Sequence, residues 1–114
     1  NEWAIPTAFS PNGDGINDYF EIPLKYEENF DLTIINRWGE VVYETDYESY
    51  ERNCEVQYDA NNPGVIVERT CKFWDGTNRN DGGDCAPGTY FYILNVDFIG
   101  GGGEQFKGAV TLIR

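Results

Sequence analysis

Alternating hydrophobic and polar positions predict β-strands along the first half of the chain. Phe30, Leu32 and Ile34 alternate with polar residues, which is the period of a half-buried strand. The polar turn 36–39 separates that strand from the apolar residues 41–43, so the two segments predict a hairpin. Earlier apolar runs at 3–9 and 19–22 predict two further strands, and a polar, glycine-rich loop separates them.

The C-terminal third of the chain predicts another hairpin. Apolar residues occupy alternate positions from Tyr90 to Phe98, while Phe91 and Ile93 make the opposite side of this segment apolar as well. A strand that is apolar on both faces is typical of the centre of a sandwich. The glycines at 100–103 then allow a turn into a last strand, and no long stretch has a helical period. We therefore expect an all-β fold, an immunoglobulin-like β-sandwich of about seven strands.

Residues 46–72 interrupt the even spacing of the strands and contain a smaller pattern. If the turn at 61–64 is centred between its second and third residues, positions whose numbers sum to 125 face each other, as Cys54 and Cys71 do. A directly opposed pair of cysteines on antiparallel strands lies within disulfide reach at a non-hydrogen-bonded site. We predict an inserted β-hairpin that stands off the sandwich and is closed by this disulfide. The alternative is an irregular loop with Cys71 bonded to Cys85.

Composition and charge exclude several classes of function. Twenty acidic residues against eight basic ones give a net charge of -12, which repels a phosphate backbone and makes nucleic acid and anionic lipid poor partners. No apolar run approaches the ~20 residues that a membrane-spanning helix needs. The chain has no His, so it has no Ser-His-Asp or Cys-His arrangement and lacks the usual zinc ligands. No spacing selects a carboxylate pair for glycoside hydrolysis, and we expect no enzyme activity.

The loop between the first two predicted strands has the most specific chemistry. The side-chain oxygens of Asn12, Asp14 and Asp18 and the backbone carbonyl of Ile16 are spaced two residues apart, with glycines that permit a tight loop. Calcium binds roughly six to eight oxygens, so further ligands would come from another loop or from water. A weak calcium site is one hypothesis for this loop. The alternative is that these residues only form Asx turns.

Five sequence blocks, taken together and in order, resemble a known family. They are FSPNGDGINDYF (9–20), LTIINRWGEVVYE (32–44), WDG (74–76), APGTYFYILNV (86–96) and KGAVTLIR (107–114). Their order resembles that of the gliding-motility-associated C-terminal domain, the type B sorting domain of the type IX secretion system in Bacteroidetes. The chain departs from this family at residues 46–72, where the family usually has a short connection.

The resemblance implies that residues 1–114 form one C-terminal sorting domain without catalytic activity. Such a domain directs the N-terminal remainder of its parent protein through the periplasm and the outer membrane, to the cell surface or the medium. Its partner would be the secretion machinery, including a porin-like outer-membrane component. The matched residues that could carry recognition are Asn12, Asp14, Asp18, Arg37, Trp38, Gly39, Trp74, Asp75, Gly76, Thr111, Leu112, Ile113 and Arg114. We expect most of them to serve folding, with the two tryptophans closing the ends of the sandwich.

A second hypothesis is a calcium-dependent adhesion or carbohydrate-binding module. β-Sandwiches host many functions, and they often present loops and aromatic side chains to ligands. Tyr47, Tyr50 and Tyr58 would form the platform of such a module. A sorting signal is C-terminal in its parent and required for export, whereas a binding module has neither constraint.

Overall fold

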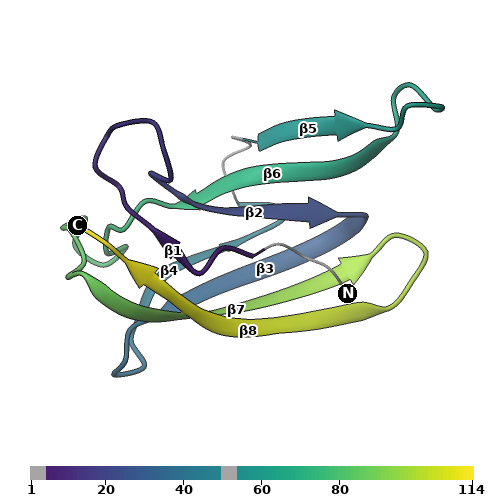
Figure 1. Cartoon of the computed structure of the whole chain (residues 1–114). Helices are drawn as coiled ribbons and strands as arrows, with labels where there is room; N and C mark the ends of the chain where they lie inside the picture. The colour runs from purple at the N-terminus through teal and green to yellow at the C-terminus, as the bar shows by residue number, and fades with distance from the viewer. Residues whose placement is uncertain (1–4, 50–53) are drawn as a thin grey trace.

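The computed structural model describes residues 5–49 and 54–114, which form eight strands and no helix. Two sheets pack face to face (Figure 1), so the predicted all-β sandwich is confirmed with one strand more than expected. The strands are β1 (Ala8–Phe9), β2 (Phe20–Lys25), β3 (Glu27–Ile35), β4 (Val41–Asp46), β5 (Cys54–Tyr58), β6 (Ile66–Trp74), β7 (Gly88–Phe98) and β8 (Gly103–Leu112). The described part of the chain contains no helix that could span a membrane.

The larger sheet has the strand order β1-β8-β7-β3-β4, with β7 at its centre as its apolar residues predict. Its neighbouring strands are antiparallel except β1, which pairs in parallel with β8 through Ala8↔Thr111 and Phe9↔Leu112. Within the described residues, the predicted first strand is therefore only two residues long. Its short pairing joins the first and last strands of the domain.

The smaller sheet has the order β2-β6-β5 and contains the predicted disulfide. Cys54 faces Cys71 across the β5–β6 ladder, and the two residues are bonded with their Cα atoms 4.1 Å apart. The predicted register is confirmed up to a bulge near Tyr58. The alternative bond between Cys71 and Cys85 is wrong, because Cys85 is a free, buried thiol.

The predicted hairpin within residues 46–72 does not stand off the sandwich. Its second strand, β6, is the central strand of the smaller sheet and pairs with β2 from Phe20↔Trp74 to Lys25↔Glu68. The apolar residues at the end of β6 are buried against the core, so this strand cannot leave the sandwich without exposing them. The hairpin is an integral part of the fold.

The core lies between the two sheets and is supplied by alternate residues of the long strands. Its fully buried members include Ile22, Leu24, Leu32, Ile34, Leu94 and Val110. Trp74 is also fully buried, with its ring centroid 5.3 Å from that of Phe9 and 5.0 Å from that of Tyr90. Trp38, in contrast, is 72% exposed. The expectation that it closes the sandwich is wrong, because it lies in the β3–β4 turn beyond the sheet.

Candidate functional site

The turns that contain parts of the five matched sequence blocks lie at one end of the sandwich (Figure 1). Strands β2, β4 and β7 begin there, while β3, β6 and β8 end there. The segments at this end are the β1–β2 loop (10–19), the β3–β4 turn (36–40), the β6–β7 connection (75–87) and the last residues (113–114). We call these four segments the motif end.

Hydrogen bonds within the β1–β2 loop already use the oxygens that were predicted to bind calcium. The Asp18 carboxylate accepts from the backbone N–H of Gly13 at 3.1 Å and of Gly15 at 2.8 Å. Asn12 and Asp14 each accept from the backbone N–H two residues later, which is the geometry of an Asx turn. Gly13 and Gly15 have φ values of 80° and 81°, which favour glycine. Turns therefore organise this loop.

The calcium site remains a prediction. Ile16, whose carbonyl was expected to be a ligand, is 66% exposed. Among the described residues, no three His, Cys, Asp or Glu side chains are grouped so that they could hold a metal. A calcium ion at this loop would compete with the backbone N–H groups for the Asp18 oxygens, and it would take its other ligands largely from water.

The side chain of Arg114 fastens the β6–β7 connection to the last strand. Its Nε donates to the carbonyl oxygen of Cys85 at 2.9 Å, and its Nη2 donates to that of Gly76 at 2.8 Å. The same Nη2 lies 3.8 Å from the Asp84 carboxylate. A Cβ at position 76 would lie 2.9 Å from Arg114 Nη2, and the φ of +86° there also favours glycine. The absence of a side chain at Gly76 therefore leaves the space that the Arg114 guanidinium occupies.

Trp74 and Asp75 are also used by the fold. The Trp74 indole donates to the carbonyl of Thr77 at 2.8 Å. The Asp75 carboxylate accepts from the backbone N–H of Thr77 at 3.1 Å and from its hydroxyl at 2.6 Å. These bonds shape the start of the β6–β7 connection, which supports a structural role for the WDG block.

The terminal block holds β8 in the larger sheet. The backbone N–H of Thr111 donates to Thr7 at 2.8 Å, and that of Ile113 donates to Phe9 at 3.0 Å. The side chain of Leu112 is only 1% exposed, so it belongs to the core. These contacts support a folding role for this block as well.

Arg37 and Trp38 are the candidates that the fold leaves most available for a partner. The side-chain oxygen of Asn36 accepts from the backbone N–H of Trp38 at 3.0 Å and of Glu40 at 2.9 Å, and Gly39 completes the turn with a φ of 85°. The Arg37 guanidinium lies 4.5 Å from the centre of the exposed Trp38 ring. A hollow of about 120 Å³ separates this turn from the start of β7.

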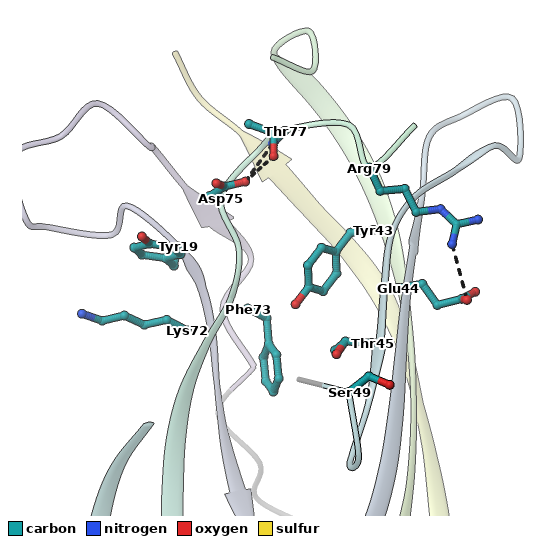
Figure 2. Close-up of a pocket in the computed structure, with 10 residues that line it drawn as sticks. All are labelled: Tyr19, Tyr43, Glu44, Thr45, Ser49, Lys72, Phe73, Asp75, Thr77 and Arg79. Atoms are coloured by element: carbon teal, nitrogen blue, oxygen red, sulfur yellow. Dashed lines mark hydrogen bonds and ion pairs between the residues drawn. The ribbon is translucent and has the colours of Figure 1, made fainter. Parts of the chain in front are cut away.

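A wider hollow of about 430 Å³ opens between β4 and β6 (Figure 2). Its lining residues are Tyr19, Tyr43, Glu44, Thr45, Ser49, Lys72, Phe73, Asp75, Thr77 and Arg79. Lys72 Nζ lies 5.7 Å from the centre of the Tyr19 ring, and Arg79 Nη1 lies 3.5 Å from the Glu44 carboxylate. The charged groups of this hollow therefore already contact each other or its wall, and they do not converge on a ligand position.

The tyrosines of the predicted carbohydrate platform have different environments. Tyr47 packs edge-on against Phe30 with ring centroids 6.2 Å apart, so it contributes to the core. Tyr58 is 56% exposed on β5, in the other sheet. Tyr50 lies outside the described residues. Tyr47 and Tyr58 therefore do not present a common surface.

Cys85 is buried in the motif end and is not an activated nucleophile. Burial raises the pKa of the Cys85 thiol, and it also raises the pKa of the Tyr90 phenol nearby. The Tyr90 hydroxyl donates to the carbonyl of Ala86 at 2.7 Å, which ties β7 to the connection before it. A buried thiol with a raised pKa stays protonated at neutral pH and reacts slowly.

Comparison with known proteins agrees with the resemblance of the sequence blocks. A family model described as "CHU_C Type IX secretion signal domain" matches residues 3–112. No curated protein matches the chain. A solved structure similar to the chain is CopC from Methylosinus trichosporium OB3b, with 14% sequence identity and a TM-score of 0.47. That match covers 96% of this chain and 84% of CopC.

Proposed function

The chain belongs to the family of type IX secretion signal domains, and on this premise we propose that it directs a larger parent protein to the cell surface or the medium. The observation that carries the proposal is the family match over residues 3–112, which includes the hairpin of the smaller sheet. The five ordered sequence blocks support it independently of the structure. In this proposal the domain is the C-terminal address of its parent.

We propose that the domain does no chemistry of its own. The sequence contains no His, and the free thiol of Cys85 is buried with a raised pKa. The carboxylates of Asp18 and Asp75 accept hydrogen bonds that hold turns. These features support a role in recognition rather than catalysis.

The proposed partner is the secretion machinery, including a porin-like component of the outer membrane. Most of the matched residues at the motif end are engaged in the fold, whereas Trp38 is 72% exposed and Arg37 lies against its ring. Exposed aromatic and arginine side chains are enriched where proteins bind each other. The Arg37–Trp38 turn is therefore the part of the motif end that best supports contact with the machinery.

An export assay tests this function directly. A reporter with an ordinary signal peptide is fused before residues 1–114 and produced in a host that has the type IX system. We expect the reporter at the surface or in the medium, and we expect deletion of Thr111–Arg114 to leave it in the periplasm. Because the deletion also damages the fold, Arg37→Ala is tested beside it after its thermal unfolding has been shown to be unchanged.

Two results would contradict the sorting function. One is a reporter that reaches the surface equally well without the domain, which would favour an adhesion module. The other is a correctly folded wild-type fusion that remains in the periplasm.

A further inference from the structure

The outer face of the larger sheet, which points away from the smaller sheet, is polar at one end. Asp31, Asn95 and Gln105 are neighbours in register on β3, β7 and β8. Asn95 Nδ2 donates to Asp31 Oδ1 at 2.8 Å, and Gln105 Nε2 donates to Asn95 Oδ1 at 2.7 Å. This row satisfies part of its own hydrogen bonding and suits a surface in contact with water.

The same face becomes apolar toward the motif end. Ile35 pairs with Val41 on one side and with Phe91 on the other, and Phe91 pairs with Ala109. Ile93 follows two residues after Phe91 on the same face. We call these five residues the apolar patch. All of them except Val41 line a shallow groove of about 410 Å³, together with Tyr92, Lys107 and Gly108.

No described segment of the chain covers the apolar patch. The smaller sheet packs against the opposite face, where Leu32 and Leu94 are fully buried, whereas Phe91 remains 40% exposed. A strand that is apolar on both faces usually lies between two layers. The second apolar side of β7 therefore lacks the layer that its sequence predicts, although β7 is at the centre of its sheet.

Three sequence blocks that are distant along the chain build this patch. Ile35 and Val41 come from the block 32–44, Phe91 and Ile93 from the block 86–96, and Ala109 from the terminal block. The exposed Trp38 lies in the turn that joins Ile35 to Val41, which places it at the motif end beside the patch. The blocks thus meet at a surface as well as in the core.

The acidic side chains near the patch have partners, whereas two basic side chains near it form no ion pair with the described residues. Glu44 pairs with Arg79 at 3.5 Å, and Glu40 accepts from the Asn36 side chain at 2.9 Å. Lys107 lies beside the patch, opposite Ile93 in register. Within residues 5–49 and 54–114, Lys107 has no carboxylate at ion-pair distance.

Arg37, in the β3–β4 turn, lies against the Trp38 ring and has no carboxylate at ion-pair distance among the described residues. Two cations without carboxylate partners are notable in a chain with a net charge of -12. A partner with carboxylates at the edge of an apolar surface would complement them.

We propose that the apolar patch and Trp38 form the surface by which this domain docks onto a protein of the export machinery. The inference rests on the proposed function and names the chemistry of the partner. That partner presents apolar side chains to Phe91 and Ile93, and carboxylates to Lys107 and Arg37. The net charge of -12 repels an anionic membrane, which disfavours lipid as the occupant. The Asp31–Asn95–Gln105 row would lie at the polar rim of the interface.

The test compares two matched double variants in the export assay. Phe91→Thr/Ile93→Thr removes the centre of the patch and keeps residues that favour strands. Val56→Thr/Tyr58→Thr makes a similar change on β5, where the two side chains are 40% and 56% exposed. With unchanged thermal unfolding in both, we expect surface export of the reporter to fall about tenfold for the first and to stay at the wild-type level for the second.

The charge of the partner is tested with Lys107. We expect Lys107→Glu to reduce export, and we expect Lys107→Arg to retain it, because the arginine can pair with the same carboxylate. If Phe91→Thr/Ile93→Thr proves less stable than wild type, Trp38→Ala replaces it, since that side chain lies beyond the sheet and is 72% exposed.

The other outcomes would overturn the docking surface, the sorting function or the identity of the partner. If the wild-type fusion is exported and both folded double variants are exported equally, the docking surface is wrong and the sorting function stands. If the wild-type fusion is not exported, the sorting function itself fails. If sedimentation shows a wild-type dimer that Phe91→Thr/Ile93→Thr dissolves, the occupant is a second copy. If wild type but not this variant binds vesicles containing phosphatidylglycerol, the occupant is a membrane.

Discussion

The disulfide between Cys54 and Cys71 gives a quantitative test of how the smaller sheet is held together. Cys54→Ser breaks the bond and leaves Cys71 in its buried place. The disulfide joins residues separated by 17 positions, for which loop-closure entropy in the unfolded chain corresponds to about 3 kcal/mol at 25 °C. With an unfolding entropy of about 2.1 cal/mol/K per residue, a chain of 114 residues should lose about 13 °C in Tm.

The measurement is thermal unfolding by circular dichroism under non-reducing conditions. Reductant should lower the Tm of the wild type to that of Cys54→Ser and should leave the variant unchanged. Cys85→Ser, which removes the free thiol and keeps the disulfide, should still respond to reductant. A Tm difference of only about 2 °C between wild type and Cys54→Ser would refute the loop-closure argument. A peptide map with a Cys71–Cys85 bond would refute the register.

Three further predictions concern the motif end. Arg114→Ala should lower the free energy of unfolding in urea by about 2 kcal/mol, because the carbonyls of Gly76 and Cys85 lose charged donors; an unchanged midpoint would contradict this. Cys85 should react slowly with iodoacetamide until urea is added. Burial raises the pKa of this thiol. Its contribution to stability is therefore complete below the unfolded pKa and is lost as the pH rises through the folded pKa, so Tm should fall in alkaline buffer. We also propose that weak calcium binding at the β1–β2 loop raises Tm in millimolar calcium relative to chelator and that Asp14→Ala abolishes the difference; identical wild-type melts would exclude it.

The β5–β6 register could be predicted from sequence because two local constraints agree. The turn at 61–64 and the two cysteines both require Cys54 to face Cys71, as the structure shows. The place of β6 in the fold could not be predicted in this way. Its central residues Glu68, Arg69 and Thr70 are polar, yet they are half-buried between β2 and β5, and Arg69 also pairs with the buried Glu27 of β3 at 3.4 Å. No local pattern encodes that pairing.

The sequence does not distinguish exposed from buried residues where the same residue type occurs both on the surface and in the core. Trp38 and Trp74 occur in similar polar, glycine-containing contexts, yet one is 72% exposed and the other is fully buried. The difference is that Trp74 ends strand β6 and faces the opposite sheet, whereas Trp38 lies in a turn beyond the sheets. The alternation in β7 likewise identified two apolar sides, but only the number of layers determines that Phe91 faces solvent. Arg114 was predicted as a recognition residue, and its contacts with two carbonyls became visible only in three dimensions.

The parallel pairing of β1 with β8 determines how the domain responds to mechanical tension. A force that draws the segment before Ile5 away from Arg114 acts along these two strands and in opposite directions on each. The hydrogen bonds from Thr111 to Thr7 and from Ile113 to Phe9 are then loaded in shear and must break together, rather than one after another. The Arg114 side chain adds a second attachment at the same point, through its two bonds to the β6–β7 connection. Tension applied between the two ends of the chain would therefore load this strand pair in shear.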